Sequence, residues 1–116
     1  MKAVKLGEGL RFDFGERYGV DVQGVEIEWL IYGPAMALRY FRVQPGVHIP
    51  EHSHPWEHVI IVRKGGMKVR VKDEEVEVRE LDHIHVPSNV PHEYWVSGDG
   101  CEFYCIINCM GENCVP

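Results

Sequence analysis

Three of the seven histidines in this chain of 116 residues, His52, His54 and His58, fall within a stretch of seven residues. Alternate residues of an extended strand point to the same side, so the imidazoles of His52 and His54 are expected to lie about 6.5–7 Å apart at Cα. That separation allows both rings to bind one ion, with Nε2 about 2.0–2.2 Å from the metal. His58 begins the next strand and can supply a third ligand, and His92, at the start of a later strand, can close the site.

Histidines on strands are commonly polar surface residues, and a single H-x-H pair is a weak indication of a metal. Here the histidines are clustered, and the prolines near them, Pro50 and Pro55, restrict the backbone, which favours a metal site. The other three histidines have no assigned role. His48 lies in the turn before the cluster and is expected to be structural. His83 and His85 share one strand face, and they can be surface residues, core residues or supports of the site.

Four cysteines occupy the last sixteen residues, at Cys101, Cys105, Cys109 and Cys114. A secreted disulfide scaffold spreads its cysteines along the chain, and a zinc ribbon needs C-x2-C pairs, so neither class fits. Parity on a strand over residues 101–108 puts Cys101, Phe103, Cys105, Ile107 and Cys109 on one apolar, inward face. Two alternatives remain open: a local disulfide between Cys109 and Cys114, and a separate thiolate metal site.

The elements that must hold these side chains are short β-rich runs separated by turn residues. The expected strands cover residues 25–31, 36–43, 57–63, 67–72, 76–79, 83–86, 92–96 and 101–108. The strands at 67–72 and 76–79 are joined by an acidic turn and predict a hairpin. Strands of four to eight residues with turns throughout indicate a single all-β domain, either a sandwich or a barrel.

The composition excludes several classes of function. The chain is 45% hydrophobic and carries a formal net charge of −6, which fits a folded domain without a basic surface for nucleic acid or anionic membranes. No apolar run approaches the roughly 18–20 residues needed to span a bilayer. The first residues lack the long apolar core of a signal peptide, so a cytoplasmic location is expected.

Two motifs carry a resemblance to a known family. The pattern Gly46-x5-His52-x-His54-x3-His58-x6-Gly65 resembles the first motif of the cupins, and Asp82-x4-Pro87-x4-His92 resembles a degenerate second motif. The resemblance covers residues 35–108. It implies a double-stranded β-helix (jelly-roll) barrel with one divalent metal inside, and frequent dimerisation. The expected division is an N-terminal arm at 1–24, a barrel at 25–110 and a tail at 111–116.

This sequence departs from the family pattern at one ligand position. His58 stands where the family has Glu, and the neighbouring Glu57 would face the opposite way on a strand. We therefore expect a metal site of four histidines, His52, His54, His58 and His92. That variant is similar to small manganese-binding cupins of thermophilic organisms, so the resemblance implies manganese, with iron and zinc as alternatives. The second motif also departs, with Asp82 in place of Gly and Val96 in place of Asn.

Other residues are expected around the ion. Phe103 and Cys105 share the inward face and would line an apolar chamber suited to a small, partly apolar substrate. Cys105 can be a plain core residue or a thiol beside the ligands. Trp56 can cover the rim of the site, or pack as a core or dimer-contact aromatic. Tyr94 has the parity of His92 and is expected to point toward the chamber.

The leading hypothesis is a metal-dependent oxygenase or dioxygenase, because the histidine set has no acid–base pair beside it. The alternatives are a non-catalytic binding module, such as a sensor or storage barrel, a cupin isomerase, and a purely structural barrel. Apolar residues alternate in the N-terminal arm, at Leu10, Phe12 and Phe14, and Tyr18 follows. Such an arm can extend the sheet of a partner subunit, so a homodimer is expected.

Overall fold

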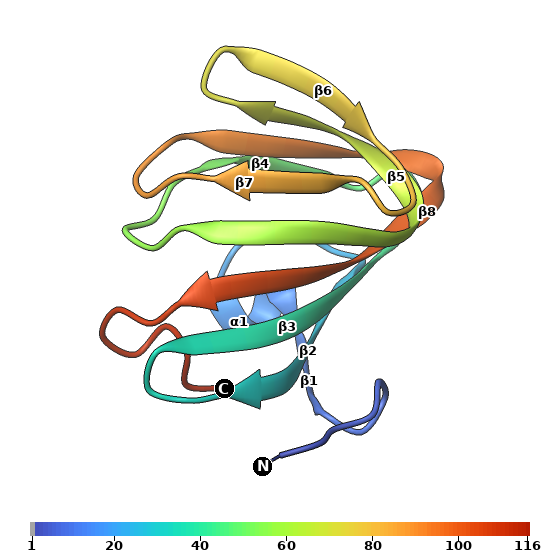
Figure 1. Ribbon diagram of the computed structural model, residues 1–116. Coiled ribbons are helices and arrows are strands. Elements are labelled where there is room, and N and C mark those ends of the chain that lie inside the picture. The colour runs from blue at the N-terminus through green and yellow to red at the C-terminus, as the bar shows by residue number, and fades with distance from the viewer. Residues whose placement is uncertain (1) are drawn as a thin grey trace.

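The computed structural model describes residues 2–116, which form eight strands and one short helix (Figure 1). The elements are β1 (Leu10–Asp13), α1 (Phe14–Tyr18), β2 (Val25–Tyr32), β3 (Met36–Val43), β4 (His48–His52), β5 (His58–Val71), β6 (Glu74–Val78), β7 (His83–Val86) and β8 (His92–Asn108). The all-β prediction is therefore confirmed. None of the helices in residues 2–116 has the length and apolarity needed to cross a membrane.

Two long strands, β5 and β8, form the centre of the fold. They are antiparallel and pair along most of their length, from His58 opposite Ile107 to Val71 opposite His92. The sequence predicted two separate strands in each of these regions. The glycine-containing segments at 64–66 and 97–100 bend the strands instead of ending them, and the register shifts between Val62 and Met67 mark the bend in β5.

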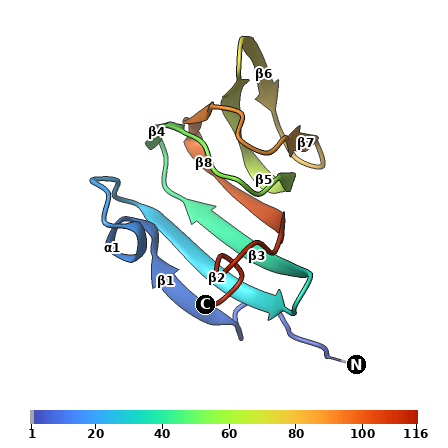
Figure 2. The same cartoon turned by 90° about the vertical axis from the view of Figure 1, so that its left-hand side faces the viewer.

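The bend divides each long strand between two facing sheets. The first half of β5 and the second half of β8 join β7 on one side and β3, β2 and β1 on the other. The other two halves pair with β6 and β4. Figure 2 shows β1, β2, β3, β8 and β5 side by side. The result is a jelly-roll barrel, and the hairpin predicted from residues 67–72 and 76–79 is present as β5 and β6.

Gly65 is required where the two long strands cross. Its φ of +75° lies in the left-handed region, and a Cβ built on it would stand 2.0 Å from the carbonyl oxygen of Gly100. No side chain fits at that distance. This glycine is the last position of the first sequence motif, and its place in the motif thus has a steric cause.

The space between the sheets is filled by apolar side chains, which include the predicted inward face of β8. Cys101, Phe103, Cys105 and Ile107 are each no more than 2% exposed, and the two cysteines are free thiols. Cys109, at the end of that face, instead forms a disulfide with Cys114. The structure therefore assigns the four cysteines to two groups, two buried in the core and two closing a loop of the tail.

The N-terminal arm extends the sheet of its own chain, whereas the alternating sequence pattern suggested a partner's sheet. β1 pairs with β2 from Leu10 opposite Trp29 to Asp13 opposite Glu26. The fully buried Glu28 carboxylate accepts hydrogen bonds from the backbone N–H groups of Gly7 and Gly9. These contacts attach the arm to the barrel of its own chain. A homodimer remains a prediction.

Candidate metal centre

Three histidines converge at one end of the barrel. His52 is the last residue of β4, His54 follows in the next loop, and His92 begins β8 opposite His52. One ligand atom from each of the three lies within 4.8 Å of the others. The His92 ring centroid is 4.2 Å from that of His52 and 4.9 Å from that of His54. This cluster can hold one metal ion.

Backbone carbonyl groups orient all three rings in the same way. The Nδ1 atoms of His52, His54 and His92 each lie 2.8 Å from a carbonyl oxygen two residues away, that of Pro50, Trp56 and Val90 respectively. A carbonyl oxygen only accepts hydrogen bonds, so Nδ1 must carry the proton. The neutral ring then has its lone pair on Nε2, which is the form that binds metals.

His92 supplies an independent test of this fit. Its Nε2 atom is buried and has no hydrogen-bond partner among residues 2–116. A buried acceptor without a partner costs about 1–3 kcal/mol. A metal ion bound by Nε2 would satisfy the atom, and imidazole ligands suit several divalent transition metals. The residues present therefore fit a metal.

Burial keeps His54 and His92 neutral. It lowers the pKa of His92 to about 4, and the neighbouring His52 and His54 lower it further through charge repulsion. Burial also lowers the pKa of His54. Both rings are consequently in the metal-binding form at neutral pH without having to lose a proton.

His58 lies beside this cluster and is 5% exposed. Its ring centroid is 5.0 Å from those of both His54 and His92. Its nitrogens contact side chains rather than carbonyl groups: Nε2 is 3.4 Å from the Tyr94 hydroxyl and Nδ1 is 3.4 Å from the Cys105 sulfur. Its role as a fourth ligand therefore stays a prediction. Burial lowers the pKa of His58 to about 2, and the charges of His92 and His54 act in the same direction.

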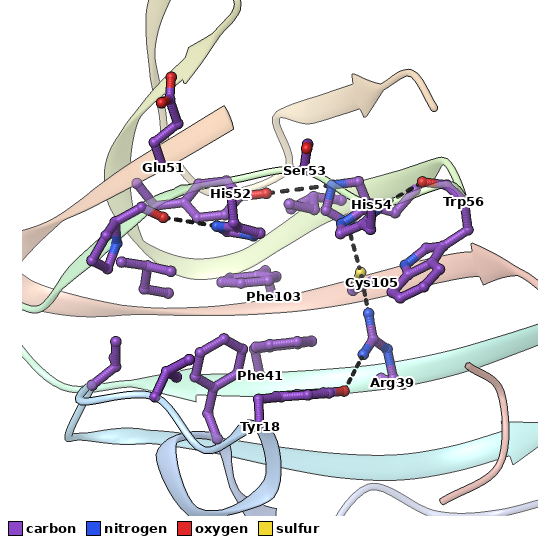
Figure 3. A pocket seen from close by; sticks show the side chains of 18 of the residues that line it. Tyr18, Arg39, Phe41, Glu51, His52, Ser53, His54, Trp56, Phe103 and Cys105 are labelled. Carbon is purple, nitrogen blue, oxygen red and sulfur yellow. Dashed lines mark hydrogen bonds between the residues drawn. The ribbon is translucent and has the colours of Figure 1, made fainter. Parts of the chain in front are cut away.

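A pocket of about 480 Å³ opens between the sheets beside the cluster (Figure 3). His52, His54 and His58 line it, as do the four residues expected around the ion, Trp56, Tyr94, Phe103 and Cys105. The Trp56 indole stacks on the His54 imidazole, with ring centroids 4.5 Å apart. The volume of the pocket falls within the range of small-molecule sites, about 300–1,000 Å³.

The other four histidines, His48, His83, His85 and His92, are not among the residues that line this pocket. His48 is exposed, stacks on Trp95 and pairs with Glu93. The exposed His85 lies 2.8 Å from the carboxylate of Glu57.

Sequence reasoning missed two parts of the pocket. Arg39 of β3 lines it although it is only 6% exposed. The signal was present, because Arg39 shares parity with Ala37, Phe41 and Val43 and so stands on an inward face that is otherwise apolar. Tyr18, at the end of α1, also lines the pocket, so the N-terminal arm contributes to the site of its own chain.

Comparisons with known proteins agree with this architecture. The sequence profile of the cupin domain family matches residues 39–107, and the chain belongs to that family. No curated protein matches the chain. Three solved structures illustrate the similarity, each with a TM-score of about 0.8.

The structure of KdgF from a Halomonas species has a TM-score of 0.82 at 12% identity, covering 97% of each chain. The polyketide cyclase RemF from Streptomyces resistomycificus has a TM-score of 0.79 at 25% identity, over 95% of this chain and 80% of that one. A predicted oxalate decarboxylase from Thermotoga maritima has a TM-score of 0.78 at 18% identity, over 94% and 100%. At such low identities the similarity to KdgF and to the Thermotoga protein establishes the fold alone.

Proposed function

We propose that this cupin is a metal-dependent oxygenase or dioxygenase that acts on a small, partly apolar substrate. The observation that carries the proposal is the convergence of three histidines, each oriented by a backbone carbonyl group, beside a pocket of about 480 Å³ lined largely by apolar side chains. In the proposed site His52, His54 and His92 bind the ion, and His58 completes the set. Manganese is the first candidate, with iron and zinc as alternatives.

The ligand set supports this chemistry. Four neutral imidazoles leave a divalent ion its full charge, whereas a carboxylate ligand would neutralise part of it. Such an ion supplies a Lewis acid and, if it is redox-active, a means of activating dioxygen. A dioxygenase places both atoms of O2 in the organic substrate, whose electrons reduce the O2, so no separate reductant is needed.

The side chains of the pocket supply binding and exclude water. Phe41 and Phe103 stack with their ring centroids 4.9 Å apart and form an apolar wall of the pocket. Trp56 covers one face of the His54 ring. A substrate against these surfaces would be held beside the histidines with little surrounding water, and this strengthens electrostatic interactions.

An isomerase is less well supported. His58 and Tyr94 do form a His/Tyr contact in the pocket. However, burial raises the pKa of Tyr94 well above its usual value and lowers that of His58 to about 2. A general acid or base works best with a pKa near the operating pH, and both groups are shifted away from it. Because neither group has a pKa suited to proton transfer, a non-catalytic binding module is the second candidate.

The activities named for the similar structures do not select one reaction. RemF is described as a polyketide cyclase and the Thermotoga protein as a predicted oxalate decarboxylase. A fold by itself does not determine function.

Two measurements test the proposal. Metal content is determined by mass spectrometry after metal repletion, for the wild type, His52→Ala and the exposed control His48→Ala. We expect stoichiometric metal in the wild type and the control, and loss in His52→Ala; wild type without metal would refute the site. Oxygen uptake is then measured with small phenols, alkenes and diketones. Metal-loaded protein that consumes no oxygen with any of them would favour the binding module.

A further inference from the structure

The least expected group in the pocket is a buried cation without a counter-ion. Arg39 is 6% exposed, and among residues 2–116 no carboxylate oxygen lies within the 4.0 Å that defines an ion pair with its guanidinium. Removing an arginine from water without a negative partner is unfavourable. The barrel retains this charge in a wall whose other inward residues on β3 are apolar.

The contacts of Arg39 hold the guanidinium in place and leave most of its donors free. Its central carbon lies 5.1 Å from the ring centroids of both Trp29 and Phe41. Nη1 donates to the Tyr18 hydroxyl at 3.4 Å, which is long for an N–H···O hydrogen bond, and Nη2 donates to the Cys105 sulfur at 3.4 Å. Nε has no partner in the described part of the chain. A guanidinium has five N–H donors, so most of them are unused.

We propose that Arg39 binds the carboxylate of the ligand, so that this pocket takes small organic acids with an apolar body. The substrate class named here rests on the proposed function, because it assumes that the pocket beside the histidines is the substrate site. The planar guanidinium matches a carboxylate and can donate two parallel hydrogen bonds to it. An incoming carboxylate would also neutralise the buried charge.

The position of Arg39 places the ligand against the histidine cluster. The Cys105 sulfur lies 3.4 Å from Arg39 Nη2 and 3.4 Å from His58 Nδ1, so one side chain separates the guanidinium from the histidines (Figure 3). The rest of the lining near Arg39 includes Phe41, Phe103 and Ile60. An acid whose carboxylate meets Arg39 would therefore rest its apolar body on these side chains, within reach of the metal centre.

Binding to metal-free protein tests this without relying on catalysis. Protein stripped of metal with a chelator is titrated by calorimetry with benzoate and phenylacetate, and with the uncharged analogues benzamide and phenylacetamide. We expect the wild type to bind one or both acids roughly tenfold to hundredfold more tightly than the matching amide, as for a charge-assisted hydrogen-bonded pair. Equal affinity for acid and amide, or no binding of either acid, would overturn the inference.

Variants locate the preference. Arg39→Met should remove the preference for the acid, and Arg39→Lys, which keeps the charge but not the planar fork, should retain part of it. The control is Arg63→Met, because Arg63 contacts the Tyr40 hydroxyl and does not line the pocket. If Arg39→Met does not fold, Arg39→Lys and the comparison of acid with amide on the wild type still show whether Arg39 binds the carboxylate.

Repeating the titrations with metal-loaded protein separates the two proposals. An acid that binds only when metal is present, and equally well to the wild type and Arg39→Lys, is held by the metal; this refutes the Arg39 assignment and supports the metal site. A protein that takes up no metal on repletion, but binds the acid in a manner that depends on Arg39, would have the opposite meaning, since this result supports the carboxylate site and refutes the proposed function.

Discussion

Glu57 and His58 are adjacent in the chain, and their side chains lie on opposite faces of the barrel wall. His58 is buried against the Tyr94 hydroxyl and the Cys105 sulfur. Glu57 is exposed, and its carboxylate lies 2.8 Å from His85 Nε2. Glu57 immediately precedes β5 and His58 begins it, and of these two candidates for one motif position only the histidine is close to the cluster.

This arrangement predicts a large difference between two single substitutions. His58→Ala should weaken metal binding by far more than Glu57→Ala, because only His58 faces the other ligands. His92→Ala should weaken metal binding at least as much as His58→Ala. The reason is that the unpartnered Nε2 of His92 belongs to the three-histidine cluster. The affinities are measured by competition with a chromophoric chelator. A stronger effect of Glu57→Ala than of His58→Ala would assign the fourth position to the carboxylate.

A second prediction concerns the anchor of the N-terminal arm. Glu28→Gln should lower the free energy of unfolding by about 1–3 kcal/mol, because a buried carboxylate that accepts two backbone N–H groups loses its charge. The pKa of Glu28 is lowered: the hydrogen bonds from Gly9, Arg42 and Gly7 outweigh the opposing effect of burial. The matched control is Glu26→Gln, whose partly exposed ion pair with Arg42 should contribute about 0–1 kcal/mol.

Urea denaturation measures the free energy of unfolding of the wild type, Glu28→Gln and Glu26→Gln. Hydrogen exchange of the Gly7 and Gly9 amides should accelerate only in Glu28→Gln. Equal stability losses for the two variants would contradict the anchoring role.

The buried histidines predict that the metal-free protein loses stability on mild acidification. The pKa values of His58 and His92 are lowered to about 2 and about 4, below the value of about 6.5 for an unfolded chain. The unfolded state therefore binds more protons, and stability falls as the pH drops below about 6.5. The slope should reach about 1.4 kcal/mol per pH unit for each such group. Urea titrations between pH 7.5 and 5 measure it.

Two variants show which residues cause that slope. His58→Gln should flatten the dependence on pH, since the variant has one group fewer that is neutral when folded and protonated when unfolded. His83→Gln, a change at an exposed position, should leave it unaltered. A slope that is the same in the wild type and in His58→Gln would show that His58 is not held neutral by burial.

A fourth prediction tests the crossing of the long strands. Gly65→Ala should destabilise the protein by about 2 kcal/mol or more, since the new Cβ would meet the Gly100 carbonyl oxygen and the backbone would keep a positive φ. Gly33→Ala is the control, because a Cβ there meets nothing within 4 Å and φ is ordinary. Thermal unfolding compares the two. Similar melting temperatures for both variants would mean that the strands can separate at the bend without cost.

Much of this architecture could be predicted from local patterns. The strand at 36–43 matches β3 and that at 83–86 matches β7 in full, because side-chain alternation is a short-range property. His52 and His54 could be proposed as ligands because they belong to the first of two recurrent motifs, and His92 because it ends the second. The joining of strands into β5 and β8 was not predicted, since a glycine that bends a strand and one that ends it are alike in sequence.

Other features depend on contacts between distant parts of the chain. The parity of Arg39 on its strand indicates an inward side chain, but only the folded chain shows that Trp29 and Phe41 pack around the guanidinium. The arm at 1–24 was assigned to a partner's sheet because an alternating strand does not specify which edge it joins. The tail disulfide was one of several alternatives for Cys109 and Cys114, and the folded chain is what brings them together.

The sharing of β5 and β8 by both sheets has a consequence for motion. Because these two strands continue through the bend, the sheets cannot swing apart like hinged plates without breaking the hydrogen bonds that join β5 to β8. The barrel walls are therefore expected to keep their shape when a ligand enters. The short helix α1 lies outside these two strands and contributes Phe14 and Tyr18 to the pocket lining, so a displacement of α1 would break none of the hydrogen bonds between β5 and β8.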